Sequence, residues 1–261
     1  YSQEELEKIT MGIDRGVVRP IQAGSEYFDL TPEQEKNKKG KEKYLKRLQT
    51  QLSRQRKGSN RRRRTKNKIG RAHDKIANIR KDFCHQTSRK LIDKPETKIY
   101  VLEDLRTKNM TKSAKGTIEK PGKSVKAKSG LNRSILDKGW NMMENFIKYK
   151  AFIAGKVMYK VPAAYTSQEC AVCGHIHSDN RISQELFLCL VCGNADNADN
   201  NAQKVIAKRA IKLILNSGTE LSKRGVLLDI GRGAKGKPHK PKGICAHGCE
   251  ASKKKELGQA A

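Results

Sequence analysis

The sequence lacks a long apolar run, a secretion signal and enough acidic residues to balance its basic ones. No stretch approaches the ~18 apolar residues that a membrane span requires, and no hydrophobic signal region follows a basic start. Seven cysteines are too few and too unevenly spaced for the disulfide scaffold of a secreted protein. We therefore expect a cytosolic protein.

The shortage of acidic residues leaves a large excess of positive charge. Lys and Arg total 56 against 27 Asp and Glu, which gives a formal net charge of +29. Self-repulsion of this size is tolerated when a polyanion neutralises it. Nucleic acid is the expected polyanion, and an acidic membrane surface is the alternative. The hydrophobic residues, 36% of the chain, allow a modest core in one large domain or two small ones.

Strand and helix patterns alternate along the chain, which predicts an α/β fold built on a sheet. Apolar residues alternate with others in the first expected strand, and they recur every three or four positions in the expected helices. We expect strands over 8–16, 98–102 and 156–161, helices within 41–92, 135–147 and 198–215, and a mobile loop over 107–130. Residues 17–23 are the expected hairpin partner of the first strand. Beyond Ser217 the Gly-, Lys- and Pro-rich composition predicts disorder.

The two helices expected within 41–92 are strongly basic. The segment GSNRRRRTKNK joins them, and the second helix carries further Arg and Lys on the face away from its isoleucines. Such a pair is suited to tracking the phosphates of nucleic acid. The alternative is an ordinary solvated face. The candidate nucleic-acid contacts are Arg61, Arg62, Arg63, Arg64, Lys66, Lys68 and Arg71.

Two CxxCG motifs, separated by 15 residues, predict a metal site. The glycine after each pair permits the positive φ of a tight knuckle. Four thiolates at ~2.3 Å close the tetrahedral shell of a structural zinc site and leave no position open. A redox pair would not need the second motif. His175 and His177 lie between the motifs and are surplus to four ligands. The expected zinc ligands are Cys170, Cys173, Cys189 and Cys192.

Three acidic residues stand at the ends of apolar elements. Asp14 and Glu103 end two expected strands, and in parallel strands both would emerge at the same edge of the sheet. Asp199 lies in the first turn of the last helix, on the apolar face of Ala202 and Ile206, where a carboxylate is costly unless something neutralises it. Two Mg²⁺ ions would do so and would activate water for phosphodiester cleavage. The alternatives are a simple turn at Asp14 and a helix-dipole interaction at Asp199.

Segments spread over about residues 8–215 resemble TnpB (OrfB-type) proteins. These segments run in the family's order: GIDRG, GSNRRRR, HDKIANIRKDF, YVLEDLRTKNM, YKAFIAGKVMYKVPAAYTSQECAVCG and FLCLVCGNADNADNNAQKVIA. Proteins of this family accompany bacterial insertion sequences and are usually described as transposases. They also resemble the ancestors of type V CRISPR effectors.

The resemblance implies an RNase H-like RuvC nuclease that cuts DNA, is guided by an RNA and needs Mg²⁺. The catalytic residues that it implies are Asp14, Glu103 and Asp199. The last of these falls in the family's D-x-N-A-A pattern, although Asn200 and Gln203 replace the commoner Val and Ala. Asp196 is a nearby second candidate, but Asn201-Ala202 fixes the register on Asp199.

The expected organisation is a nuclease core over 8–165 and 196–216, with a basic helical insertion at about 41–92, a zinc ribbon over 166–195 and a basic tail over 217–261. The implied partners are target DNA and a guide RNA, in the bacterial cytoplasm at the nucleoid. A non-catalytic zinc-ribbon module that binds nucleic acid and a strand-transfer transposase are the rival functions. Because residue 1 is Tyr and family members carry a further N-terminal region, we also expect a fragment that folds and binds DNA without target selectivity.

Overall fold

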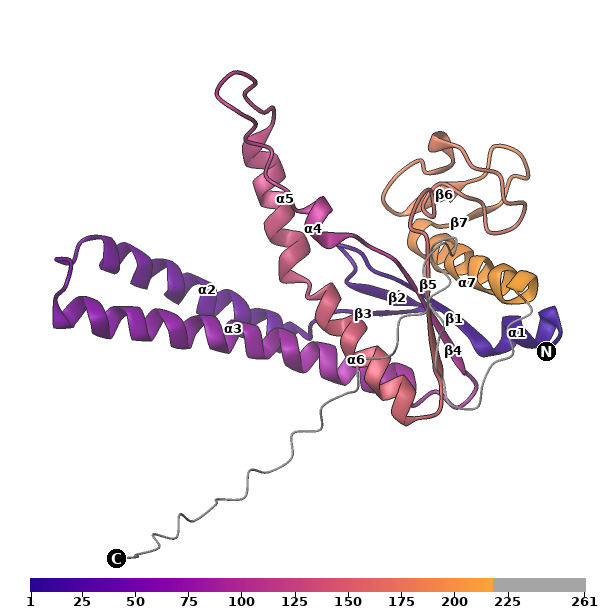
Figure 1. Ribbon diagram of the computed structural model, residues 1–261, viewed down its shortest axis with the longest axis horizontal. Helices are drawn as coiled ribbons and strands as arrows, with labels where there is room; N and C mark the ends of the chain where they lie inside the picture. Colours follow the sequence, from indigo (N-terminus) through magenta and orange to yellow (C-terminus); the bar gives the residue numbers. More distant parts are fainter. Residues whose placement is uncertain (218–261) are drawn as a thin grey trace, which may run out of the picture. The chain divides into compact units, whose positions relative to one another are not determined.

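The computed structural model describes residues 1–217, so the tail expected to be disordered lies outside the described residues. A five-stranded sheet lies between two layers of helices, and a two-stranded sheet belongs to the cysteine-containing segment (Figure 1). The expected α/β fold is confirmed. None of the helices in the described part is long and apolar enough to cross a membrane. The helices are α1 (Gln3–Ile9), α2 (Pro32–Ser53), α3 (Asn60–Ile92), α4 (Thr107–Met110), α5 (Val125–Asp137), α6 (Trp140–Ile153), α7 (Ala198–Ser217) and the 3-10 turn η1 (Ser178–Asn180).

The large sheet has the strand order β3-β2-β1-β4-β5. Its strands are β1 (Thr10–Asp14), β2 (Ile21–Ala23), β3 (Glu26–Phe28), β4 (Ile99–Glu103) and β5 (Val157–Val161). β1 pairs antiparallel with β2, as the expected hairpin requires, and parallel with β4, which pairs parallel with β5. The three expected strands are confirmed. β3 was not expected, because a three-residue strand with two exposed side chains has no apolar alternation.

Side chains along the central strands alternate between two faces of the sheet. Ile13 and Leu102 point to one face and pack with residues of α3 and α6. Val101 points to the other face and packs with residues of α1 and α7. Asp14 and Glu103 each follow a residue of the first face, so both are directed to the face that α7 covers.

α2 and α3 pack along each other as a helical pair (Figure 1). α2 begins at Pro32, well before the helix start expected near Lys41. Its first turn has no apolar period, but a capping box formed by Thr31 and Gln34 stabilises it. The sequence suggested that the four arginines form the connection between the two helices, but they do not. They lie in the first turns of α3, directly after its N-cap Ser59.

The stretch 107–130 was predicted to be a mobile loop, but helices occupy its two ends. α4 covers 107–110, and the first part of α5 covers 125–130. The Nζ of Lys128 donates to the carbonyl oxygen of Met110 at 2.6 Å, and the Nδ2 of Asn132 donates to that of Thr111 at 2.9 Å. Such contacts between distant positions leave no periodic signal in a sequence, so composition alone suggested a loop.

The helix expected over 135–147 is in fact divided between α5 and α6. The two helices meet at Gly139, which has a φ of 68° and interrupts the helical path. The final helix, expected over 198–215, is confirmed as α7. The cysteine-containing segment adds β6 (Leu186–Leu188) and β7 (Ala195–Asn197), which pair antiparallel directly before α7.

Candidate functional site

The carboxyl ends of β1 and β4 bring Asp14 and Glu103 together. The parallel register pairs Ile13 with Leu102, so the two acids follow as the next neighbours. Glu103 is buried and Asp14 is partly buried. Neither carboxyl group is therefore fully hydrated. The parallel pairing on which their proximity depended is confirmed.

α7 carries Asp199 to the same place because this helix lies very close to β1. A Cβ atom on Gly12 would lie 1.9 Å from the carbonyl oxygen of Gln203. Only glycine permits this approach of helix and strand. The helix start is fixed by Asn197, whose Oδ1 accepts a hydrogen bond from the amide of Asp199 at 3.1 Å. The cap expected at Asn197 is thus confirmed.

Asp14 lies within electrostatic reach of the other two candidate acids. Burial, followed by the negative charges of Glu103 and Asp199, raises the pKa of Asp14 to about 7. Burial also raises the pKa of Glu103. Carboxylates that destabilise one another in this way favour a bound cation, and oxygen atoms are the ligands that Mg²⁺ prefers.

Glu103 is held by two residues that sequence reasoning missed. Arg15 follows Asp14 and therefore points to the opposite face of the sheet, where its Nη1 donates to Glu144 at 3.1 Å. Its Nη2 donates to the backbone carbonyl oxygen of Glu103. The hydroxyl of Thr166 donates to the Glu103 carboxylate across 63 positions of sequence. A lone Arg in a basic chain and a Thr in a loop carry no pattern that would single them out.

A third residue missed from the sequence, Arg181, brings a positive charge to the acids. Its Nη2 lies 3.6 Å from the Oδ1 of Asp199, and its charge opposes the rise in the pKa of Asp14. Arg181 lies in the loop between the CxxC motifs, which has no periodicity. A guanidinium in this position is suited to bind a phosphate as well as a carboxylate.

Asp196, the second candidate for the last carboxylate, has other partners. Its Oδ2 accepts a hydrogen bond from Lys204 at 2.7 Å, and its Oδ1 accepts one from Asn200 at 2.8 Å. Burial acts to raise the pKa of Asp196, but these hydrogen bonds outweigh it and lower the pKa. Asp199, and not Asp196, is the acid whose charge contributes to the raised pKa of Asp14.

The four cysteines of the CxxC motifs converge. The two Sγ atoms of Cys170 and Cys192 lie 3.6 Å apart, those of Cys173 and Cys189 lie 3.5 Å apart, and all four lie within 4.8 Å of one another. Tetrahedral zinc with Zn–S bonds of ~2.3 Å separates its sulfurs by about 3.8 Å. The cluster therefore has the dimensions of a zinc site. Within residues 1–217 it is the only such group of three or more His, Cys, Asp or Glu.

Each CxxCG motif forms the expected knuckle. The amide of Gly174 donates to the carbonyl of Cys170 at 2.9 Å, and that of Gly193 donates to the carbonyl of Cys189 at 3.0 Å. Both glycines have a positive φ, 76° and 68°. A hydrogen bond from the backbone amide of Cys192 is the main influence that lowers the pKa of Cys189 to about 6, which favours its thiolate.

Asn201 ties the first knuckle to α7. Its buried side chain accepts a hydrogen bond from the amide of Ala171 at 2.9 Å and donates one to the carbonyl of Glu169 at 2.7 Å. Because Asn201 lies in the first turns of α7, the cysteine cluster is fixed relative to the candidate acids. His175 and His177 lie outside the cluster of ligand atoms.

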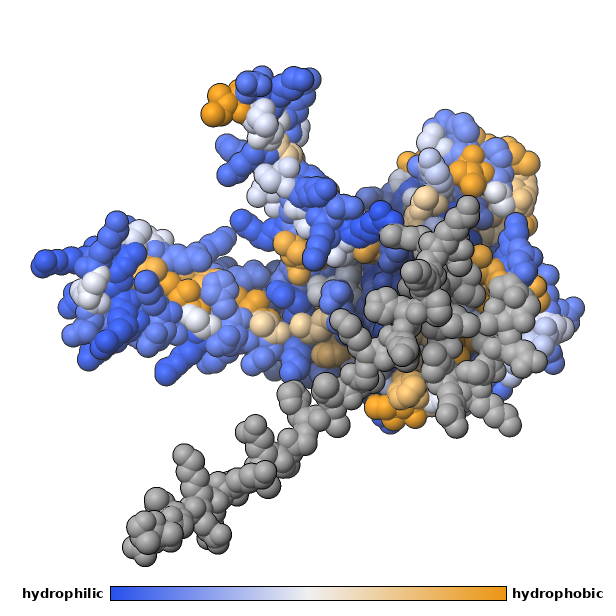
Figure 2. All heavy atoms as spheres, viewed as in Figure 1, coloured by the Kyte–Doolittle hydropathy of each residue, from blue (hydrophilic) through white to orange (hydrophobic). Residues whose placement is uncertain are grey.

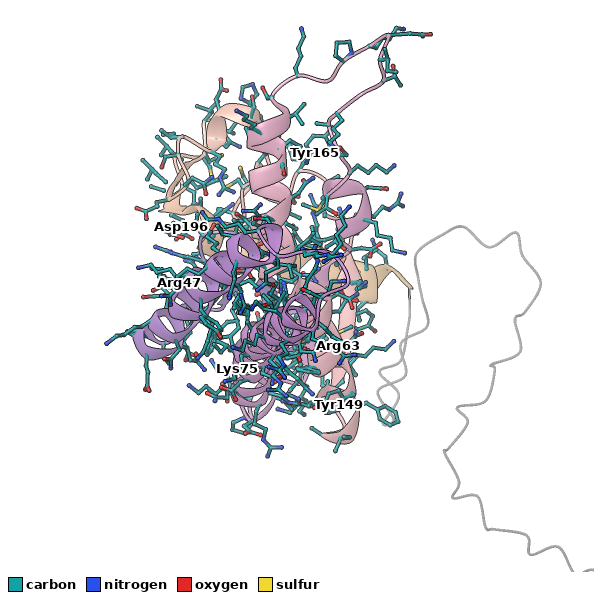
Figure 3. All side chains as sticks on the ribbon, turned by 90° about the vertical axis from the view of Figure 1, so that its left-hand side faces the viewer. Arg47, Arg63, Lys75, Tyr149, Tyr165 and Asp196 are labelled. Atoms are coloured by element: carbon teal, nitrogen blue, oxygen red, sulfur yellow. The ribbon has the colours of Figure 1, made fainter. Side chains whose placement is uncertain are left out.

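The helical pair carries most of the candidate nucleic-acid contacts on its surface. α3 contains 12 Lys and Arg but only two acidic residues, so its exposed faces are positively charged. Figure 3 labels Arg47 on α2 and Arg63 and Lys75 on α3, and all three are exposed. Six of the seven candidate residues are likewise exposed: Arg61, Arg63, Arg64, Lys66, Lys68 and Arg71.

The seventh candidate, Arg62, has partners inside the protein. Its Nη1 donates to the carbonyl oxygen of Gln55 at 3.0 Å and also to that of Leu52. These bonds satisfy carbonyl groups at the end of α2. Arg62 therefore stabilises the turn between the two helices.

Two family models match the chain. Residues 2–114 match OrfB_IS605, described as "Probable transposase". Residues 140–206 match Cas12f1-like_TNB, described as "Cas12f1-like, TNB domain". The first match contains Asp14 and Glu103, and the second contains Asp199 and the four clustered cysteines.

The chain is also similar to known proteins. The chain is 42% identical over 200 residues to the "Putative RNA-guided DNA endonuclease InsQ" of Escherichia coli (strain K12), covering 76% of this chain and 48% of that protein. It is 34% identical over 142 residues to the CRISPR-associated endodeoxyribonuclease Cas12f1 of Sulfoacidibacillus thermotolerans, covering 51% of this chain and 28% of that protein. A cryo-EM structure of a Cas12f1–sgRNA–target DNA complex matches 77% of this chain and 50% of its own, with a TM-score of 0.49 and 20% identity.

The chain thus spans half or less of the length of these relatives. The two matched segments contain every residue that the sequence suggested for a site. The resemblance to TnpB (OrfB-type) proteins is confirmed: residues 2–114 match the OrfB_IS605 family, residues 140–206 match the Cas12f1-like TNB domain, and the similar proteins are named as RNA-guided DNA endonucleases.

Proposed function

We propose that the chain forms the RuvC-like, RNase H-like nuclease part of an RNA-guided DNA endonuclease. The observation that carries this proposal is the setting of Asp14: its burial, together with the nearby negative charges of Glu103 and Asp199, raises its pKa to about 7. The parallel strands β1, β4 and β5, with helices on both faces, place two of these acids at one edge of the sheet.

In this proposal the carboxylates of Asp14, Glu103 and Asp199 would hold two Mg²⁺ ions. Such ions, when bound, activate water and stabilise the leaving oxygen of a phosphodiester. The hydrogen bonds from Thr166 and Arg15 hold Glu103 in one orientation before substrate arrives, which lowers the cost of reorganisation. Arg181, beside Asp199, supplies a donor for a phosphate oxygen of the bound strand.

The four clustered cysteines are proposed to hold one structural zinc ion. The spacing of their sulfurs fits a closed tetrahedral shell, which leaves no position for a substrate. The segment that the ion would stabilise carries Arg181 and is tied to α7 by Asn201. Zinc would therefore support the nuclease site indirectly, by fixing the loop that brings Arg181 to Asp199.

DNA as substrate and RNA as guide are the proposed partners. The support is the net charge of +29 and the relatives described as RNA-guided DNA endonucleases. Exposed basic residues on α3 would contact phosphates, which positions a protein on nucleic acid without reading its sequence.

Two alternative functions have less support. A non-catalytic binding module needs none of the three acids, and gathering them in a half-buried site is costly without a cation. A strand-transfer transposase could use the same carboxylates. The two enzymes differ in their products, because a nuclease leaves free DNA ends whereas a transposase joins them to a second DNA.

The proposal is tested by incubating the chain with DNA and Mg²⁺ or Mn²⁺. We expect free ends, no joined products, and no cutting when the metal is chelated. Asp14→Asn, Glu103→Gln and Asp199→Asn should each slow cutting by at least about 10²-fold, because each would remove a ligand of the metal ions that stabilise the charge developing in the transition state. DNA binding should persist in all three variants, since each lowers only negative charge.

Asp196→Asn is the matched control for Asp199→Asn. It makes the same chemical change three residues away, in a carboxylate whose partners are Lys204 and Asn200. We expect it to cut at nearly the rate of the unmodified chain. Loss of cutting in Asp196→Asn, with normal cutting in Asp199→Asn, would assign the third acid to Asp196.

A further inference from the structure

The segment between β4 and α6 forms a second basic structure, separate in sequence from the α2–α3 pair. Residues 106–134, which we call the finger, contain α4, a short hairpin and most of α5. Nine of these residues are Lys or Arg and only Glu119 is acidic. Figure 1 shows α5 leading to the hairpin at its outer end. The finger begins directly after the carboxyl end of β4, where Glu103 lies.

The finger is braced along its length. Near its base the Nζ of Lys128 on α5 donates to the carbonyl of Met110 on α4 at 2.6 Å. In the hairpin the amide of Gly122 donates to the carbonyl of Lys115 at 2.8 Å. A Cβ atom on Gly122 would lie 1.5 Å from the carbonyl oxygen of Ala114, so the two arms touch here. The two arms of the hairpin are therefore held together by backbone contacts.

An ionic contact fixes the inner end of α5 to the helical pair. Asp137 accepts a hydrogen bond from the Nη2 of Arg80 on α3 at 2.8 Å and another from the Nζ of Lys38 on α2. The side chain of Asp137 is about three-quarters buried in this contact. This contact joins the base of the finger to α2 and α3.

The outer part of the finger combines unpaired positive charge with an apolar tip. Five exposed lysines, none of which forms a salt bridge within residues 1–217, lie here: Lys112, Lys115, Lys120, Lys123 and Lys126. Ile118, at the turn of the hairpin, has a relative exposure of 101%. Figure 2 shows hydrophobic atoms at this outer end within a hydrophilic surface. A single exposed Ile is ordinary on a protein surface, but this one lies at the turn of a segment that carries nine Lys and Arg and a single acidic residue, Glu119.

We propose that the finger binds a nucleic-acid strand, with its lysines on the phosphates and Ile118 against a base. A series of unpaired ammonium groups is complementary to a phosphate backbone. Apolar side chains such as Ile are inserted between bases by proteins that distort nucleic acids. The base of the finger follows the end of β4, so a strand that runs from the outer part to the base would approach the candidate acids. Only that last consequence rests on the proposed nuclease function, because strand binding needs no cleavage.

The proposal is tested by binding, with EDTA present so that cleavage plays no part. The probes are a single-stranded DNA and an RNA of the same sequence, each carrying 2-aminopurine, whose fluorescence rises when it is unstacked. Ile118→Ser should remove most of the fluorescence rise and change the affinity little. Replacing Lys115, Lys120 and Lys123 by Ala should reduce the log–log salt slope by about 2, at ~0.7 per phosphate on a single strand. The probe that loses more affinity identifies the strand as DNA or RNA.

The matched control replaces Lys8, Lys98 and Lys212 by Ala. These lysines are also exposed, and their replacement removes the same amount of charge. Lys8 and Lys98 precede the amino ends of β1 and β4, and Lys212 lies in the second half of α7, which packs against α1, so all three lie away from the finger. The control should leave the salt slope within the error of the unmodified chain. Equal slopes for the two triple variants would overturn the phosphate contacts. An unchanged fluorescence rise in Ile118→Ser, with unchanged circular dichroism, would overturn the contact with a base.

Discussion

Replacing Gly12 by Ala places a methyl group where the backbone of α7 already lies. The new Cβ would be 1.9 Å from the carbonyl oxygen of Gln203. Because such atoms do not approach within 3.0 Å, α7 must move away from β1 by about 1 Å. Asp199 lies four residues before Gln203 on the same helix, so it moves with that carbonyl. A misplacement of about 1 Å is enough to cost roughly 10²-fold in a catalysed rate.

The same substitution should also lower stability. Forcing a methyl group into a close-packed contact costs about 1–3 kcal/mol in the free energy of unfolding. The assays are urea unfolding, followed by circular dichroism, and the rate of Mg²⁺-dependent nicking of plasmid DNA under single-turnover conditions. We expect a folded protein whose nicking rate is about 10²-fold lower.

Gly70→Ala is the control for this experiment. Gly70 lies in α3, and a Cβ atom there meets nothing within 4 Å. Alanine is favoured over glycine in a helix by about 1 kcal/mol, so this variant should be slightly more stable and equally active. If Gly12→Ala nicked DNA as fast as Gly70→Ala, the close contact of β1 with α7 would not set the position of Asp199, and the geometric argument for the site would fail.

Three further predictions follow from the other parts of the molecule. Cys173→Ser combined with Cys192→Ser should abolish the one equivalent of zinc per chain that mass spectrometry should detect in the purified protein; retained zinc would refute the cluster as its site. In the metal-free chain the pKa of Asp14 is about 7 in the folded state and ~3.9 in the unfolded state. The proton on the Asp14 carboxyl group therefore stabilises the folded state fully below about pH 4, and this stabilisation is lost as the pH rises through about 7. The free energy of unfolding should therefore fall over that window, Asp14→Asn should flatten the fall, and an identical pH profile in that variant would contradict the raised pKa. Replacing Arg61, Arg63 and Arg64 by Ala should reduce the salt slope of duplex DNA binding by about 2.7. Arg62→Ala should chiefly lower the stability of the α2–α3 pair. Equal effects of the two changes on DNA binding would contradict the assignment of Arg62 to structure and of the other three arginines to phosphates.

Features with a period or a fixed spacing could be predicted from the sequence. β4 and β5 are short apolar runs, and α7 repeats its apolar residues at helical spacing after the cap Asn197. The CxxCG spacing predicted the cysteine cluster because a knuckle is a local structure. The proximity of Asp14 and Glu103 followed from a single assumption, that their strands are parallel.

Features that depend on contacts between distant residues could not be predicted. α2 begins early because of a capping box, and the finger is ordered by side-chain contacts to backbone carbonyls. Arg15, Thr166 and Arg181 reach the acids only once the sheet, α7 and the ribbon are assembled. Gly12 was counted simply as part of a strand, since its role depends on how closely α7 packs against it.

The most direct test of the central claim is the anomalous diffraction of crystals soaked in Mn²⁺, measured near the manganese absorption edge. The account predicts manganese peaks in contact with the carboxylates of Asp14, Glu103 and Asp199, and no such peak at Asp196. In Asp14→Asn crystals these peaks should weaken or vanish. Manganese bound only elsewhere, or full occupancy in the Asp14→Asn variant, would contradict a metal-dependent nuclease site at these three residues.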